Sequence, residues 1–68
     1  MTTSLMEIYS VEIGDILYVN GDLYTVVDTD YADEGDDIIL TLVDEEGNRK
    51  KLSGPTNKEV KIVVNEYV

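Results

Sequence analysis

The sequence predicts an all-β fold, a small barrel of five to six short antiparallel strands. Apolar runs rich in β-branched residues recur at spacings of about ten residues and are separated by turn-forming residues, as in meandering sheets and small barrels. The runs Ile38–Val43 and Val60–Val64 lack the i, i+3, i+4 apolar spacing of an amphipathic helix. Asn20-Gly21 favours a type I′ hairpin turn, which needs a positive φ at both central residues.

The first half of the chain holds the expected opening strands. Leu5–Tyr9 supplies apolar side chains for either a short strand or one helical turn, while Met1–Ser4 is expected to fray. Val11–Ile13 alternates as the end of a strand would. Ile16–Val19 and Leu23–Val27 flank the predicted turn, so we expect them to pair as an antiparallel hairpin.

The second half begins with an acidic connection, Asp28–Asp37, which is expected to lie outside the strands. Ile38–Val43 is the most apolar run and predicts a central strand. Asp44–Asn48 predicts a loop, followed by a polar edge strand over Arg49–Leu52. Val60–Val64 predicts the closing strand, with its even-numbered residues on one face.

Composition is consistent with one folded domain spanning residues 1–68. The apolar fraction of 43% is close to that of globular proteins, so the low hydrophobicity of disordered chains is missing. The chain contains no cysteine, which fits a cytoplasmic setting. No apolar run is long enough for a membrane span or a signal peptide, and we expect neither.

Charge is distributed very unevenly along the chain. The net charge at pH 7 is −10, from 15 acidic and 5 basic residues. Residues 1–48 hold 13 of the acidic residues and no Lys or Arg, whereas residues 49–68 hold all five cations. A field of this sign repels nucleic acid and anionic membranes and attracts basic proteins. Acidity can serve solubility alone, but so long a stretch without a cation favours a binding role.

The stretch from Glu12 to Asp28 resembles the opening hairpin of SH3-like small barrels of the KOW type. A Gly-Asp turn, a short strand, a Gly turn and a Tyr-x-Val-Val pattern follow one another, similar to the N-terminal domain of bacterial translation elongation factor P. The resemblance covers about a quarter of the chain and implies an SH3-like barrel. Where elongation factor P carries a basic loop with a modified lysine, this chain has Asp33-Glu34-Gly35-Asp36-Asp37. The reversed charge argues against RNA contact through that loop.

Catalytic and metal-dependent functions are not expected. The sequence contains no His, Cys or Trp, and so small a barrel leaves little volume for a pocket that excludes water. The acidic connection fits no calcium loop, because Ala32, Asp33 and Ile39 stand where an oxygen ligand, glycine and glutamate are needed. We therefore expect no enzyme activity, no cofactor and no metal site.

In size and acidity the chain also resembles the small proteins with which bacteriophages inhibit host DNA-binding proteins such as the histone-like protein HU. Carboxylates two residues apart on an extended strand are separated by about 6.6 Å, close to the spacing of successive phosphates along DNA. Asp28 and Asp30 have this separation, as do the acidic pairs at 34/36 and 44/46 if their segments are extended. The main hypothesis is a DNA mimic that occupies the nucleic-acid-binding surface of a basic bacterial protein and inhibits its DNA binding.

This hypothesis predicts one acidic partner-binding face, centred on the acidic connection and supported by neighbouring turns. Its residues are Asp15, Asp22, Asp28, Asp30, Tyr31, Asp33, Glu34, Asp36, Asp37, Asp44, Glu45 and Glu46. The expected partner is an HU-like nucleoid protein or RNA polymerase in the host cytoplasm, with no direct contact to nucleic acid or membrane. The sequence also permits a homodimer through exposed strand edges.

The alternative hypothesis is an SH3-like adaptor module in a transcription or translation complex. Such a module would use apolar edge contacts and tyrosines, of which the chain has five. Tyr31 is the tyrosine that we expect to contact a partner. The basic cluster Arg49-Lys50-Lys51 is expected to pair with Asp44–Glu46 across their hairpin, each exposed ion pair contributing about 0–1 kcal/mol.

Overall fold

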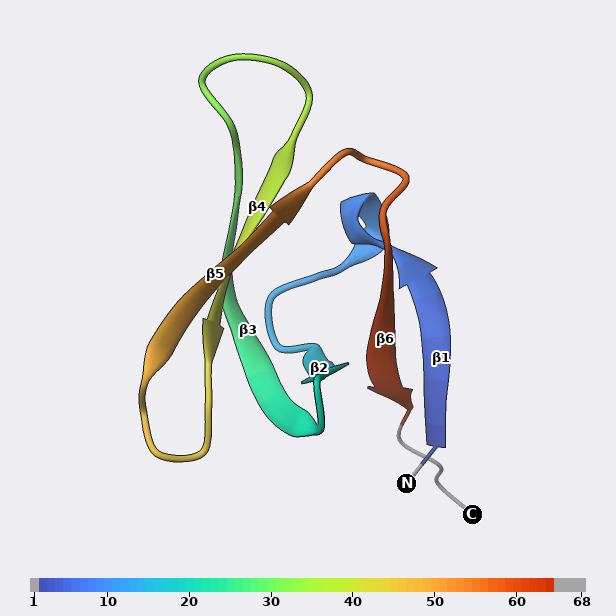
Figure 1. Cartoon of the computed structure of the whole chain (residues 1–68), viewed down its shortest axis with the longest axis vertical. Coiled ribbons are helices and arrows are strands. Elements are labelled where there is room, and N and C mark those ends of the chain that lie inside the picture. Colours follow the sequence, from blue (N-terminus) through green and yellow to red (C-terminus); the bar gives the residue numbers. More distant parts are fainter. Residues whose placement is uncertain (1, 65–68) are drawn as a thin grey trace.

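The computed structural model describes residues 2–64 and confirms the all-β prediction (Figure 1). Six antiparallel strands form one sheet in the spatial order β1-β6-β2-β3-β4-β5. Within these residues, no helix has the length and apolarity needed to cross a bilayer. The elements in chain order are β1 (Thr2–Glu7), the 3₁₀ turn η1 (Ile8–Ser10), β2 (Ile16–Val19), β3 (Asp22–Tyr31), β4 (Ile38–Val43), β5 (Arg49–Gly54) and β6 (Glu59–Val64).

The β2–β3 hairpin forms at the turn that the sequence predicts. Asn20 and Gly21 have φ values of 51° and 89°, so both central residues have the positive φ that a type I′ turn requires. The strands pair in an antiparallel register that puts Val19 opposite Asp22. The hairpin prediction is therefore confirmed.

β3 is longer than the sequence predicts, and its length changes the acidic segment. Asp28–Tyr31 continues the strand and pairs with residues 38–41 of β4. The register shifts between Val26 and Asp28, so Val27 lies in a β-bulge. The prediction that the connection begins at Asp28 is wrong: only residues 32–37 lie between the strands. Pairing with the apolar β4 strand outweighs the low β propensity of Asp.

β1 is an edge strand that pairs with β6. The paired segment runs from Thr2 opposite Val64 to Glu7 opposite Glu59. The expected fraying is thus wrong for residues 2–4, because a strand distant in the sequence holds them, and Met1 lies outside the described residues.

The segment between β1 and β2 contains both a helical turn and an irregular connection. Leu5–Tyr9, for which a strand and a helical turn were both open, holds the end of β1 and the start of η1. Ile8 N–H donates to the carbonyl of Lys58 at 2.8 Å, which fixes η1 beside the start of β6. Val11–Ile13 forms no strand, but Val11 is buried.

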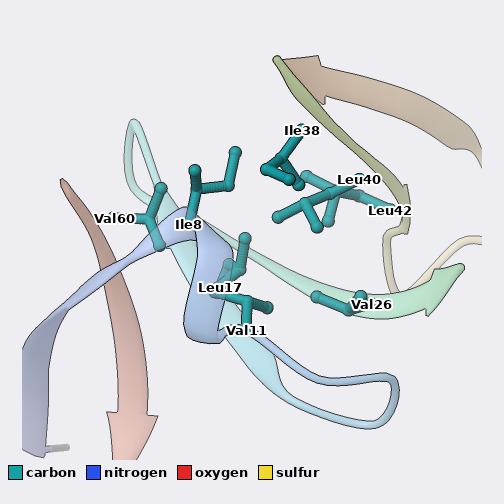
Figure 2. Packing of buried hydrophobic residues seen from close by; sticks show 8 residues of the cluster. All are labelled: Ile8, Val11, Leu17, Val26, Ile38, Leu40, Leu42 and Val60. Carbon is teal, nitrogen blue, oxygen red and sulfur yellow. The ribbon is translucent and has the colours of Figure 1, made fainter. Parts of the chain in front are cut away.

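β4 contributes more side chains to the core than any other strand. Ile38, Leu40 and Leu42 are buried, and the residues between them are half-buried. Figure 2 shows these side chains facing those of η1, β2 and β6 across the interior of the curved sheet. The buried cluster consists of Ile8, Val11, Leu17, Val26, Ile38, Leu40, Leu42 and Val60.

β5 and β6 largely follow the sequence predictions. β5 is an edge strand, as expected from its cations, and extends to Gly54. β6 lies between β1 and β2. Of its even-numbered residues, Val60 is buried and Ile62 half-buried, but Val64 is exposed.

Candidate interaction surfaces

The β3–β4 loop, residues 32–37, carries four exposed carboxylates, those of Asp33, Glu34, Asp36 and Asp37. The Ala32 N–H donates to the Asp37 carbonyl at 2.9 Å and closes the loop. Gly35 has a φ of 87°, a conformation that glycine adopts without steric cost. The segment is bent rather than extended, so the carboxylates at 34 and 36 lack the regular spacing of a strand.

Asp28 and Asp30 lie on the β3 strand itself. Their cross-strand partners are Thr41 and Ile39, so both carboxylates project from the same face of the hairpin. Asp28 Oδ1 accepts a hydrogen bond from the N–H of residue 29 at 2.9 Å, and Asp30 Oδ1 accepts one from Tyr31 N–H at 2.8 Å. Of the three acidic pairs at 28/30, 34/36 and 44/46, this pair lies on an extended strand, as the mimicry hypothesis required.

Asp44 stabilises the β4–β5 turn. Its Oδ1 atom accepts hydrogen bonds from the N–H groups of Glu46 and Asn48, both at 2.9 Å. Its Oδ2 atom accepts one from the Asn48 side-chain amide at 3.3 Å. These bonds, led by the one from the Asn48 backbone, lower the pKa of Asp44, although desolvation partly opposes them. Because this segment is a turn, the expected extended spacing of Asp44 and Glu46 is wrong.

Asp15 and Asp22 lie in or beside other turns. Asp15 Oδ2 accepts the Glu12 N–H at 2.8 Å and so helps to form the turn before β2. Asp22 begins β3 and lines an open groove of about 450 Å³ together with Gly21, Leu23 and the acidic residues 44–46.

The predicted single acidic face is divided between the two ends of the molecule. The described structure measures 42 × 25 × 19 Å. In Figure 1 the β3–β4 loop lies at one end of the long axis, and the β2–β3 and β4–β5 turns lie at the other. The geometry therefore contains two acidic clusters, one from Asp28 to Asp37 and one formed by Asp22 with residues 44–46. The partner-binding roles of these residues stay predictions.

The basic cluster does not pair with acids as predicted. Within residues 2–64 no ion pair of 4.0 Å or less is formed. Lys50 Nζ instead lies 5.4 Å from the centroid of the Tyr24 ring, in the range of a cation–π contact. Lys50 therefore contacts the half-buried Tyr24 of β3 and not the acidic residues of its own hairpin. The sequence around Lys50 does not predict this contact, because Tyr24 is distant along the chain.

Three apolar side chains on or beside β3 are exposed, and the sequence interpretation named only Tyr31 among them. Gly14 N–H donates to the Val26 carbonyl, and Val26 N–H donates to the Asp15 carbonyl, both at 2.8 Å. This pairing makes Ile13 and Val27 the residues that flank a backbone-paired site, and their side chains are 64% and 37% exposed. Tyr31, the expected contact residue, is 62% exposed at the end of β3. The bulge that exposes Val27 has no marker in the sequence.

The described residues form no cluster of side chains that could bind a metal ion. Over positions 2–64, no group of three or more acidic side chains is close enough to hold an ion. The two acidic clusters of this part of the chain therefore do not amount to a ligand set for a metal ion.

The fold of the chain is similar to that of translation initiation factors of known structure. The sequence matches no protein-family model and no curated protein sequence. The structure is similar to that of eukaryotic translation initiation factor 5A from Methanococcus jannaschii, with a TM-score of 0.75 and 18% identity over 88% of this chain and 49% of that one. A translation initiation factor 5A family protein from Naegleria fowleri gives a TM-score of 0.74 and 14% identity, over 88% and 46%. The chain thus spans about half the length of these proteins.

The hypothesis of a bacteriophage DNA mimic that inhibits HU or another nucleoid protein is wrong. The structural neighbours are translation initiation factors, and the division of the carboxylates between two ends removes the continuous row that mimicry requires. The resemblance to a translation factor barrel is supported at the level of the fold. HU-like proteins and RNA polymerase as partners followed from the mimicry hypothesis and stay untested.

Proposed function

We propose that this chain is an SH3-like adaptor module of a translation complex. The observation that carries the proposal is the fold shared with translation initiation factor 5A, at a TM-score of 0.75 over 88% of the chain. Since the chain spans about half of those proteins, the proposal concerns a single binding module. It assigns no catalytic step, and it places the module in the cytoplasm, where translation takes place.

The partner in this proposal is a protein component of the complex. The exposed carboxylates of the β3–β4 loop would meet RNA phosphates with the same sign of charge, and burying such a contact is unfavourable. This loop occupies the position at which the elongation factor P resemblance implies a basic segment. With an acidic loop at this position, the fold is better suited to binding a protein than to binding RNA.

The contact surface in this proposal is the exposed apolar group formed by Ile13, Val27 and Tyr31. The backbone pairing of Gly14 with Val26 places Ile13 near Val27. Tyr31 follows Val27 on the same strand, about 13 Å farther along from the rise per strand residue. Covering apolar and tyrosine side chains is favourable because it removes apolar surface from water and costs little side-chain entropy. Carboxylates of the same hairpin would then lie at the polar rim of the contact.

Sedimentation with purified ribosomes tests the proposal. The folded chain is expected to co-sediment with ribosomes or one of their subunits in a sucrose gradient. The double variant Ile13→Ser, Tyr31→Ser should lose most of this association, because it removes the two most exposed apolar contacts and leaves the core intact.

The matched variant neutralises the loop: Asp33→Asn, Glu34→Gln, Asp36→Asn and Asp37→Asn. It should co-sediment within about threefold of the wild type, since rim charges contribute little to affinity. Absence of any association of the wild-type chain with ribosomes would contradict the translation assignment. Loss in the neutralised variant alone would show that charge, and not the apolar group, makes the contact.

A further inference from the structure

The two edges of the sheet differ in how well they are protected against a further strand. Edge strands present unpaired N–H and C=O groups, and lysine or proline side chains commonly block them. β5 carries Arg49, Lys50 and Lys51. β1 contains no Lys, Arg or Pro, and its only charged residue is Glu7 at its end. One edge is therefore protected by charge, while the other is open to strand addition.

β1 is also accessible from residue 3 to residue 7. From residue 3 to residue 7 its backbone pairs only with β6 among the described strands, and alternate residues direct their N–H and C=O groups away from that neighbour. Leu5 is 61% exposed in the middle of the strand. An open groove of about 480 Å³ lies on the β6 side of the end of β1, lined by Leu5, Met6 and Glu7 together with Asn57 and Glu59. Backbone groups that point away from β6 and an exposed apolar side chain thus occur together on this edge.

The charges beside this edge indicate what kind of strand would fit. Glu7 and Glu59 are direct cross-strand partners, a like-charge arrangement that is destabilising. No cation of residues 2–64 forms an ion pair with either carboxylate. Lys58, which precedes Glu59, packs its side chain against Gly54. Lys61 lies opposite Leu5. A positive side chain on an added strand would relieve this repulsion, and the net charge of −10 attracts basic chains over longer distances.

We propose that β1 binds an extended segment of a basic protein by strand addition, with a lysine or arginine of that segment beside Glu7, on the side of β1 opposite Glu59. Main-chain hydrogen bonds to β1 supply the affinity, and an apolar side chain of the segment covers Leu5. This inference goes beyond the proposed function, because it holds whether or not the partner belongs to a translation complex. The edge also lies apart from the apolar group at Ile13, Val27 and Tyr31.

Peptide titration monitored by two-dimensional NMR tests the proposal. The probe is a seven-residue peptide of alternating lysine and valine with both ends blocked. The control peptide has glutamate in place of each lysine. The basic peptide should shift the amide signals of β1 and of the start of β6, with a dissociation constant on the order of 1 mM, which NMR detects readily. The acidic peptide should leave these signals unchanged.

Two sets of variants separate the edge from nonspecific charge. Leu5→Lys should abolish the shifts, because it blocks the edge and repels the probe, whereas Thr25→Lys makes the same charge change at an exposed position of β3 and should bind like the wild type. Glu7→Gln with Glu59→Gln should weaken binding about two- to fivefold, the range for exposed ion pairs. All four positions are exposed, so the fold is expected to persist.

Three outcomes would overturn the proposal. The first is an absence of shifts in β1 at millimolar peptide, and the second is a set of shifts centred on the acidic loop at residues 32–37. The third is self-association of the free chain through β1, which would assign the edge to a second copy.

Discussion

Asp44 accepts three hydrogen bonds from the turn that follows it, and this single side chain shows why a count of carboxylates says little about a binding surface. The sequence identifies Asp44–Asn48 as a loop, because Asp, Gly and Asn favour turns. It does not reveal that one carboxylate is fully engaged within the turn while Glu45 beside it is free. That difference depends on the direction of each side chain in the folded turn.

The hydrogen bonds of Asp44 predict a pH dependence of stability. Its pKa in the folded protein lies below the ordinary value of 3.8, so the ionised form stabilises the fold. This contribution is present above about pH 3.8 and is lost as the pH falls through the lowered value. Asp44→Ala should have a lower urea midpoint than the wild type at pH 7, and the difference should shrink below pH 3.8.

Glu45→Ala is the matched control for this prediction. Its carboxylate accepts no hydrogen bond within residues 2–64, so its urea midpoint should follow the wild type at each pH. A gap between Asp44→Ala and the wild type that stays constant from pH 7 to pH 3 would contradict the role assigned to the Asp44 carboxylate.

At the scale of elements, the predictions hold where the signal is local and fail where distant strands decide the structure. The Asn20-Gly21 turn and β4 follow from turn chemistry and an apolar run, and both are observed. β3 extends through Asp28–Tyr31 because β4 pairs with it, and β1 begins at Thr2 because β6 lies beside it. The composition of β3 does not predict its pairing with β4, and the composition of β1 does not predict its pairing with β6.

The alternating burial of β4 predicts unequal effects of truncating neighbouring residues. Leu40 is fully buried and Thr41 is half-buried. Leu40→Ala should lower the free energy of unfolding by about 2–5 kcal/mol, through lost apolar contact and a cavity. That is comparable to the total stability of a domain of this size, on the order of 5 kcal/mol, so circular dichroism should show partial unfolding. Thr41→Ala should cost less than about 1 kcal/mol, and equal losses at the two positions would contradict the observed alternation.

At the scale of the whole molecule, the fold could be predicted from the sequence but the arrangement of its charges could not. Turn spacing and β-branched runs predict a small barrel, and the similarity to translation initiation factor 5A supports it. The acidic residues look like one group along the chain, yet β3 carries Asp22 and Asp30 to different ends of the molecule (Figure 1). A strand of ten residues spans about 30 Å, so closeness in sequence does not produce closeness on the surface.

Hydrogen exchange of the chain, free and with purified ribosomes, tests most directly the claim that an uncharged surface binds the translation complex. The account predicts slower amide exchange around Ile13, Val27 and Tyr31 when ribosomes are present. It also predicts slower exchange in β1 if the complex supplies a basic strand. Residues 32–37 should exchange at the same rate in both samples. Protection confined to residues 32–37, or no change anywhere in the chain, would contradict the account.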